Sequence, residues 1–384
     1  MKAVILSGTP SCRAGITEHL SVAEDVEKPA IKADQVLVRV KASALNIEDI
    51  MIGAGERPGI TLKPTKEAPV VPGQEFAGIV EEIGPKVKNF KTGDAVLGHK
   101  MPLRVRYGSW AEFVAISESC LVLKPDHLSF SEAAGLPMSA LVAYGAVKAA
   151  GFISLPLLET APDKTAKVGE EEVEATTENP TLLVRKGAGG GQASLAKVAV
   201  VGASSTIGLI IVDMMVSRGV AVVGVSSSSS APAVLSAGAA AVLDRNKGGL
   251  DAKGDLSFEV VIDCVGGKSV EDSARKAMEG RGHFVTIVGS VGGGDNTFAE
   301  GSKNQLVHAG AMMSKSLKSI FSSFKYSLGT PPMTGGVKVL KQLVEENVKC
   351  VVDSEVEMFN VDALLAAVDK VNAHKTKGRL ILIN

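Results

Sequence analysis

The stretch VAVVGASSTIG, residues Val198–Gly208, decides the fold class of this 384-residue chain. Its first four residues predict a buried strand, Gly202 opens a tight turn, and the apolar run Leu209–Val212 continues as a helix. A helix that begins after such a turn directs unpaired N–H groups and its positive dipole end at a pyrophosphate. Small residues are needed there because the backbone must approach the phosphates closely. The motif is incomplete, since a serine stands where G-x-G-x-x-G has its second glycine, but its setting predicts dinucleotide binding by Ala203, Ser204, Ser205, Thr206 and Ile207.

The same alternation of strand and helix continues beyond this loop. Apolar, β-branched runs predict further strands at Val220–Val225, Val260–Cys264 and His283–Val288, and helical segments separate them. This pattern indicates an α/β domain with a doubly wound parallel sheet covered on both faces. Ligands of such sheets bind beyond the carboxyl ends of the strands. We therefore expect two strand exits to line the cofactor, through Cys264, Val265, Val288, Gly289 and Ser290.

The choice of cofactor is predicted from the end of the second strand of this domain. Sites selective for NAD usually place an Asp or Glu there to hold the ribose hydroxyls. Here the strand runs into Ser226–Ser230, and no carboxylate occurs before Asp244. Hydroxyl and N–H groups suit a 2′-phosphate, and Arg245 is the nearest cation. We expect NADP(H), bound by Ser226, Ser227 and Arg245, although a serine run can also mark a plain loop.

The residues before about Pro137 follow a different rhythm, with short strands separated by Gly and Pro. Regularly spaced strands of this kind predict a small β-barrel-like domain. Ser129 and Glu132 form a candidate capping box for a helical segment that continues to Ala150. Near the carboxyl end, a closing strand at Gly378–Ile383 is expected to return to one of the two sheets. The predicted strands are Gln35–Lys41, Phe76–Gly84, Asp94–Gly98 and Ala111–Ile116, and the late helices are Leu340–Asn347 and Val361–Val371.

An unusual stretch, about 154–196, lies between the two patterns. It contains three prolines, the acidic run Glu170–Glu172 and the glycine-rich run Gly187–Gly191. Structureless loops beyond ~12–15 residues are uncommon within compact domains. The favoured interpretation is a solvated insertion, and a lid or a partner-docking element is the alternative.

Composition excludes several classes of function. Lys+Arg 41 against Asp+Glu 42 gives a net charge of −1, which argues against a domain-wide electrostatic grip on nucleic acid or anionic lipid. The cysteines lie far apart without C-x-x-C, which argues against a disulfide framework and fits a reducing compartment. The most apolar stretch, Val198–Val216, contains a polar cluster unsuited to a membrane span. Without a visible targeting segment, a cytoplasmic protein is expected.

Several short motifs in order along the chain carry a resemblance to a known family. They are GQEFAGIV at Gly73–Val80, GDAV at Gly93–Val96, GSWAEFV at Gly108–Val114, AAGLP at Ala133–Pro137, and KGR at Lys377–Arg379. With the dinucleotide loop, they make the chain similar to the medium-chain dehydrogenase/reductase superfamily, in its zinc-free quinone oxidoreductase and enoyl reductase branch. The resemblance implies a GroES-like β-rich catalytic domain over 1–135, completed by about 335–384. It implies a Rossmann NADP-binding domain over 136–334, with the insertion at about 154–196.

The resemblance also permits a test for zinc. Zinc-dependent relatives use a Cys after the second strand and the His of a G-H-E motif, whereas this chain has Asn46 and Gln74 at those positions. An amide is a poor substitute for thiolate or imidazole at a catalytic zinc. The six histidines of the chain show no ligand spacing. A metal-free site is therefore expected.

The implied activity is NADPH-dependent hydride transfer to a conjugated acceptor: a quinone, an enone or an enoyl thioester. Such acceptors need less polarisation than a simple ketone, because hydrogen bonds to the carbonyl oxygen stabilise the developing enolate. The candidate catalytic residues are Asn46 and Tyr144, with a turn cap and simple packing as their respective alternatives. The resemblance adds Asp49, Met51, Lys377 and Gly378 as cofactor contacts.

Two departures from the family pattern keep other functions open. Ile50-Met51 stands where relatives often carry a Tyr or a Trp-Lys pair, and Val142 stands where they often carry Thr. One alternative is an NADPH-binding sensor or structural protein that has lost turnover. Another is a trans-acting enoyl reductase of a polyketide-type pathway, whose insertion docks a carrier-bound acyl chain. A homodimer is also expected, mainly from the resemblance, with Gly282–Gly289 as the sheet edge that pairs.

Overall fold

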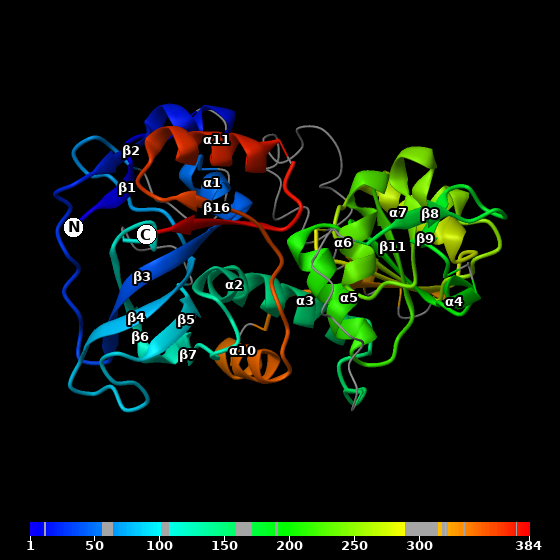
Figure 1. Ribbon diagram of the computed structural model, residues 1–384, viewed down its shortest axis with the longest axis horizontal. Coiled ribbons are helices and arrows are strands. Elements are labelled where there is room, and N and C mark those ends of the chain that lie inside the picture. Colours follow the sequence, from blue (N-terminus) through cyan, green and yellow to red (C-terminus); the bar gives the residue numbers. More distant parts are fainter. Residues whose placement is uncertain are drawn as a thin grey trace. The chain divides into compact units, whose positions relative to one another are not determined.

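The computed structural model divides into two compact units (Figure 1). Unit 1 comprises Met1–Met138 and Gly335–Asn384, and unit 2 comprises Ser139–Thr334. The structure describes residues 1–10, 13–55, 64–100, 107–158, 171–188, 191–288, 314–316, 319, 322–332, 335–373 and 375–384.

Unit 1 is built around a seven-stranded sheet in the order β16-β17-β3-β4-β5-β7, with β6 paired to β3. The predicted closing strand is β17, which pairs antiparallel with β3 so that Leu380 faces Leu45. A separate pair, β1 (Ala3–Leu6) and β2 (Leu20–Ala23), is also antiparallel. The other strands are β3 (Gln35–Leu45), β4 (Glu75–Ile83), β5 (Ala95–His99), β6 (Phe113–Ser117), β7 (Leu121–Leu123), β16 (Val352–Glu357) and β17 (Arg379–Ile383).

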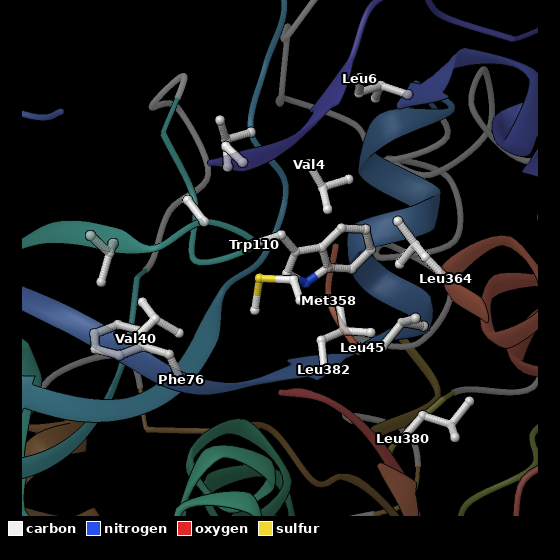
Figure 2. Close-up of a cluster of buried hydrophobic side chains, with 14 of the residues drawn as sticks. Val4, Leu6, Val40, Leu45, Phe76, Trp110, Met358, Leu364, Leu380 and Leu382 are labelled. Carbon is white, nitrogen blue, oxygen red and sulfur yellow. The ribbon is translucent and has the colours of Figure 1, made fainter. Parts of the chain in front are cut away.

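The core of unit 1 gathers residues from both ends of the chain (Figure 2). Trp110 is among its largest buried side chains, and its indole N–H donates to the Ala44 carbonyl at 3.3 Å. Leu364 and Leu382 pack in the same core, so the last 50 residues complete a unit begun by the first 138. The helices of this unit are α1 (Ile47–Gly53), α2 (Phe130–Gly135), α10 (Gly336–Glu345), α11 (Val361–Asn372) and the 3-10 helices η1 (Arg13–His19) and η2 (Glu118–Cys120).

The capping box predicted for α2 is present. The Ser129 hydroxyl accepts from the Glu132 N–H at 3.1 Å, and the Ser129 N–H donates to the Glu132 carboxylate at 2.8 Å. The helix α3 (Pro137–Ala149) follows directly, as the helical spacing predicted.

Unit 2 contains an eight-stranded sheet in the order β15-β14-β13-β10-β11-β12-β9-β8. Its six strands from β10 to β15 are parallel, and the first of them lies at the centre, where the order reverses between β10 and β13. This is the strand order of a doubly wound dinucleotide-binding sheet, which confirms the predicted fold class. The strands are β10 (Val198–Val201), β11 (Val222–Ser226), β12 (Ala241–Asp244), β13 (Val260–Asp263), β14 (Gly282–Thr286) and β15 (Phe324–Leu328). The helices are α5 (Thr206–Val216), α6 (Ala231–Ser236), α7 (Lys268–Ala277), η3 (Ser228–Ser230), η4 (Arg245–Lys247) and η5 (Gly249–Ala252).

Part of the insertion belongs to this sheet. β8 (Val173–Ala175) and β9 (Leu182–Arg185) form an antiparallel hairpin, and β9 pairs antiparallel with β12. The side chains Leu182, Leu183 and Val184 are buried. The interpretation of the whole stretch as a solvated insertion is therefore wrong for the hairpin, because its apolar run extends the core. A short helix, α4 (Gly191–Ser194), follows, while 159–170 and 189–190 lie outside the described residues.

The strand β14 is not the sheet edge that was predicted to pair between two copies. It is bonded on one side to β13 and on the other to β15. β15 was missed because its sequence, FKYSL, mixes polar and apolar residues over only five positions. Among the helices in the described ranges, none is long and apolar enough to cross a membrane.

Candidate functional site

The tight turn after β10 lies at the switch point of the unit 2 sheet, where β10 neighbours both β11 and β13. The N–H groups of Gly202 and Ala203 both donate to the Val225 carbonyl, at 3.0 and 3.2 Å. Gly202 has a φ of 74°, and a Cβ added to it would lie 2.8 Å from Val265 Cγ2. The turn therefore requires glycine for its backbone conformation and for its close approach to the exit of β13.

The helix α5 begins directly after the turn, as the sequence predicted. Ser205 is the N-cap, and its hydroxyl accepts from the Gly208 N–H at 3.0 Å. A Cβ on Gly208 would lie 2.3 Å from the Gly202 carbonyl, so glycine lets the helix pack against the turn. The N–H groups of Thr206 and Ile207 lie in the first helical turn, where backbone donors have no partner within the helix. Backbone donors and a helix dipole at a switch point suit the pyrophosphate of a dinucleotide.

The residues predicted to hold a 2′-phosphate lie at the ends of two neighbouring strands. Ser226 pairs with Asp244 in the parallel register of β11 and β12, and Arg245 follows at once as an exposed residue of η4. Ser226 is buried and its hydroxyl donates to the Ser227 carbonyl at 3.2 Å. Ser227 is partly exposed, so it is better placed than Ser226 to meet a ligand. Asp244 is a buried carboxylate that caps η4 by accepting from the Asn246 N–H at 3.0 Å.

The exits of β13 and β14 lie side by side at the same edge of the sheet. Val265 is 44% exposed at this edge of the sheet, so a ligand bound there can cover it. Burial raises the pKa of the Cys264 thiol, so this cysteine stays neutral and is a poor nucleophile. Val288 is partly exposed, whereas Gly289 and Ser290 lie outside the described residues. The Asp263 carboxyl group accepts hydrogen bonds from residues at the ends of both strands. The sequence reasoning missed this residue because nothing in the strand pattern marks it.

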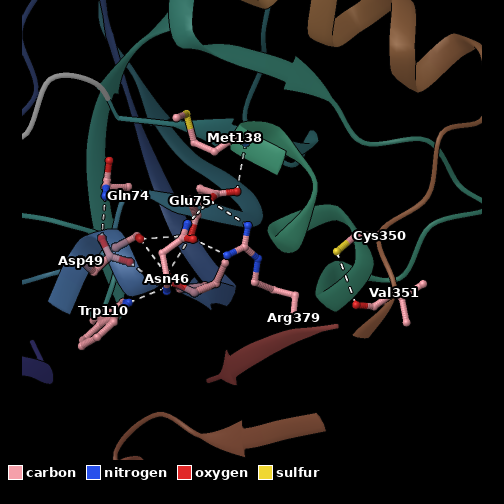
Figure 3. Close-up of polar contacts among 12 residues, drawn as sticks. Asn46, Asp49, Gln74, Glu75, Trp110, Met138, Cys350, Val351 and Arg379 are labelled. Atoms are coloured by element: carbon pink, nitrogen blue, oxygen red, sulfur yellow. Dashed lines mark hydrogen bonds and ion pairs between the residues drawn. The ribbon is translucent and has the colours of Figure 1, made fainter. Parts of the chain in front are cut away.

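A buried polar cluster in unit 1 surrounds the first of the predicted catalytic residues (Figure 3). Asn46 precedes α1 as its N-cap, and its N–H donates to Asp49 Oδ2 at 3.2 Å. The Asn46 side chain donates to Glu75 Oε1 and accepts from the Arg379 guanidinium, so both ends of its amide are bonded inside the cluster. Arg379 also pairs with Glu75 at 3.6 Å. The cluster thus joins the start of α1, the first residue of β4 and the first residue of β17.

The two carboxyl groups of the cluster sit in a water-poor environment. Glu75 is fully buried and accepts from the Met138 N–H at 3.1 Å. Asp49 accepts from Gln74 Nε2 at 3.0 Å. Burial raises the pKa of Asp49 to about 8, and the charge of Glu75 adds to this rise while the Gln74 hydrogen bond opposes it. Burial likewise raises the pKa of Glu75, and the charge of Arg379 opposes that rise.

The cluster offers poor ligands for zinc. Asn46 and Gln74 present amides, and the Asn46 amide is already bonded to a guanidinium and a carboxylate. Within the part of the chain that the structure describes, no group of three or more His, Cys, Asp and Glu residues is arranged to hold a metal ion. The residues at this position therefore do not fit a catalytic zinc.

The remaining predicted residues occupy a variety of places. Tyr144 lies half-buried on α3, and Met51 is buried in α1. The Lys377 N–H donates to Asp353 Oδ1 at 2.8 Å. Gly378 has a φ of 126°, and a Cβ there would lie 2.6 Å from the Val351 carbonyl. Lys377 and Gly378 thus have a local role in leading the chain into β17.

Comparisons with known proteins agree with this architecture. A family model described as alcohol dehydrogenase GroES-like domain matches residues 32–126, and one described as zinc-binding dehydrogenase matches residues 237–382. The 2-methylene-furan-3-one reductase of Solanum lycopersicum is 32% identical over 284 residues, which are 72% of this chain and 61% of that protein. The chain belongs to the medium-chain dehydrogenase/reductase superfamily. As the motifs indicated, this member of the superfamily combines a GroES-like domain with a Rossmann-like dinucleotide-binding domain.

A second curated relative resembles this chain in sequence, and two solved structures resemble it in fold. The chloroplastic NADPH-dependent alkenal/one oxidoreductase of Arabidopsis thaliana is 30% identical over 72% of this chain and 61% of that protein. The chain thus spans about three-fifths of the length of these two curated relatives. The solved quinone oxidoreductase from Coxiella burnetii matches 100% of this chain and 99% of its own with a TM-score of 0.67 at 18% identity. The Escherichia coli quinone oxidoreductase complexed with NADPH matches 100% of both chains with a TM-score of 0.64 at 20% identity.

Proposed function

We propose that this chain is an NADPH-dependent oxidoreductase that transfers hydride to a conjugated acceptor, such as a quinone or an enone, without zinc. One observation carries the proposal: the Gly202 turn and the start of α5 form a dinucleotide-binding edge whose neighbouring strand β11 ends in serines. Two of the relatives reported above, an alkenal/one oxidoreductase and a furanone reductase, support the choice of acceptor.

The residues of unit 2 fit the cofactor in two places. The N–H groups of Thr206 and Ile207, at the start of α5, would hold the pyrophosphate, whereas those of Gly202 and Ala203 are engaged by the Val225 carbonyl and shape the turn. Ser227 and Arg245 would hold the 2′-phosphate, since a hydroxyl and a guanidinium both donate to an anion. NADPH supplies the hydride when bound. Asp244 is a carboxylate close to these two residues. Its Oδ1 accepts the capping hydrogen bond from the Asn246 N–H, so this oxygen is already engaged and is not offered to the ribose hydroxyls of a cofactor.

The chemistry on the acceptor needs modest help from the protein. A carbonyl conjugated to an alkene accepts hydride at the far carbon, and a hydrogen bond to its oxygen stabilises the developing enolate. The phenol of Tyr144 is our candidate donor. Asn46 is proposed to position α1 rather than to contact substrate, because both ends of its amide are engaged by Glu75 and Arg379.

The test is NADPH consumption against a mixed panel of quinones, alkenals, enones and simple ketones, with each product identified. We expect turnover of the conjugated acceptors and none of saturated ketones. Replacing Tyr144 by Phe should lower kcat on enones and leave the Kd for NADPH unchanged. Turnover of saturated ketones alone would contradict the proposal, and NADPH binding without any turnover would favour a sensor or structural role.

A carrier-bound enoyl thioester is a second candidate acceptor. Its supporting observation is the run Leu155–Leu158, which begins the insertion with three exposed leucines, Leu155, Leu157 and Leu158. The test compares the rate at which an enoyl group on a carrier domain is reduced with the rate for the same group on a short free thioester. A docking surface would make the carrier-bound form the better substrate. The homodimer and the cytoplasmic location stay predictions.

A further inference from the structure

Asp263 is a buried carboxylate that the proposed chemistry does not use. It is the last residue of β13 and is 1% exposed. Its Oδ1 accepts from the N–H groups of Val265 and Gly266, at 2.8 and 2.9 Å. A single oxygen thus fixes the first turn after the strand, the turn that carries the exposed Val265 against Gly202.

The other oxygen of Asp263 reaches the neighbouring strand. Thr286 is the last residue of β14, and its hydroxyl donates to Asp263 Oδ2 at 2.9 Å. The same hydroxyl accepts from the Val288 N–H at 3.2 Å. In addition, the Ile287 N–H donates to the Asp263 carbonyl at 3.0 Å. One carboxylate therefore fixes the exits of both strands.

The side chain of Asp263 lies in a buried environment, which disfavours the charged form of a carboxyl group. Burial raises the pKa of Asp263, and the hydrogen bonds from Gly266, Val265 and Thr286 oppose the rise. Three donors directed at one buried carboxyl group satisfy the hydrogen-bonding capacity of its oxygens, as burial of a polar group requires. A core that needed only packing would be served by an apolar residue here, so the carboxylate is best explained by what it holds in place.

The position of these exits relative to the switch point assigns them to one half of a dinucleotide. Doubly wound sheets bind the two halves of the cofactor on either side of the point where the strand order reverses. Ser227 and Arg245 follow β11 and β12 on one side of β10, whereas Asp263 and Thr286 end β13 and β14 on the other. The adenosine half and the nicotinamide half should therefore respond separately to changes on the two sides.

We propose that Asp263 is a positioning residue that, through Thr286, holds the exits of β13 and β14 in the form that binds the nicotinamide half of NADPH. The inference rests on the proposed function for its cofactor. It assigns to the pair no contact with the adenosine half, and no contact with the acceptor.

The test compares two ligands on purified full-length protein by isothermal titration calorimetry. NADPH contains both halves, whereas adenosine 2′,5′-bisphosphate contains only the adenosine half with its 2′-phosphate. Thr286→Val removes the hydroxyl at nearly constant volume and leaves the bonds from Val265 and Gly266 to Asp263 in place. It should raise the Kd of NADPH about tenfold, because the bonds of the hydroxyl to Asp263 and to the Val288 N–H are both lost, and leave the bisphosphate Kd unchanged.

Two further substitutions and a control make the result interpretable. Thr286→Ser keeps the hydroxyl and should bind NADPH as the natural protein does. Asp263→Asn leaves one acceptor oxygen in place of two and should weaken NADPH at least as much as Thr286→Val. The matched control is Thr181→Val, because the Thr181 hydroxyl lies 2.6 Å from Asn179 Oδ1 and 3.0 Å from the Ala252 carbonyl, away from both exits. It should change neither Kd.

The outcomes separate this inference from the proposed activity. Equal weakening of both ligands by Thr286→Val, or weakening of neither, overturns the positioning role even if acceptors are still reduced. Selective loss of NADPH affinity supports the role even if the natural protein reduces no acceptor, a result that would instead overturn the activity. Failure of the natural protein to bind either ligand overturns both.

Discussion

Asp49 shows what burial does to a single ionisable residue in this molecule. Its carboxyl group has a pKa of about 8 in the folded chain, against 3.8 as the ordinary value, mainly because of burial. Between these two pH values the folded state binds more protons than the unfolded state does. The stability that Asp49 contributes is therefore fully present below about pH 4 and is lost as pH rises towards 8.

Asp49→Asn should remove this loss. Its slope of unfolding free energy against pH between 5 and 8 should be less negative than that of the natural protein, by at most about 1.4 kcal/mol per pH unit. Urea unfolding at four pH values measures the slopes. Glu118→Gln is the control. Hydrogen bonds from the Lys88 and Asn89 N–H groups lower the pKa of Glu118, so removing this carboxyl group cannot make the slope between pH 5 and 8 less negative. Parallel slopes for Asp49→Asn and the natural protein would contradict the account.

Ser227 tests the choice of cofactor at the same scale. Placing a carboxylate there should repel a 2′-phosphate, and like charges a few ångströms apart near a surface interact by about 1–4 kcal/mol. Ser227→Asp should therefore raise the Kd of NADPH by at least ~10-fold and affect NADH much less. Fluorescence titration with both cofactors measures this, and Ser227→Ala is the control for loss of the hydroxyl alone. Equal Kd values for NADPH and NADH in the natural protein would refute the assignment.

At the residue scale, the sequence predicted groups whose neighbours are close along the chain. The capping box of Ser129 and Glu132 and the Gly202 turn fall in this class, because local spacing defines them. The bond between Arg379 and Asn46 spans 333 residues, and only the fold brings these two side chains together. Asp263 was missed for the same reason, since its partner Thr286 lies on the next strand of the sheet.

At the scale of elements, the hairpin β8–β9 is the clearest addition to what the sequence predicted. The β-branched run Val198–Val201 is recognisable because a glycine turn and an apolar helical run follow it. LLVR at Leu182–Arg185 is equally short but follows a proline within an acidic, loop-like stretch. Its pairing with β12 on one side and β8 on the other makes it a strand. β15 escaped prediction on similar grounds.

The hairpin should contribute to the stability of unit 2. Leu182 is buried in the core with Val184, so Leu182→Ala should lower the unfolding free energy by about 2–4 kcal/mol through lost burial and a residual cavity. Leu195→Ala in the same insertion is the matched control, because Leu195 is 73% exposed and its loss should change stability by less than ~0.5 kcal/mol. Chemical unfolding measures both. If the two variants prove equally stable, the hairpin is only a surface addition.

At the scale of the whole molecule, the chain combines a Rossmann-like sheet suited to NADPH with a GroES-like unit. In the GroES-like unit, amide side chains occupy the positions at which zinc-dependent relatives carry zinc ligands. Activity should therefore survive dialysis against a chelator, and elemental analysis should find less than one zinc per chain. The physical reason is that Asn46 and Gln74 supply neither thiolate nor imidazole. Activity that disappears with the chelator and returns with zinc would show that another set of residues binds the metal.

The most direct measurement of the central claim follows the hydride itself. Chelator-treated protein is incubated with an alkenal and with NADPH deuterated at both C4 positions, and the product is analysed by mass spectrometry and NMR. We expect a saturated aldehyde that carries one deuterium on the carbon β to the carbonyl. Failure to transfer deuterium to any alkenal or enone together with failure to reduce any quinone, or activity only after zinc is added, would contradict this expectation.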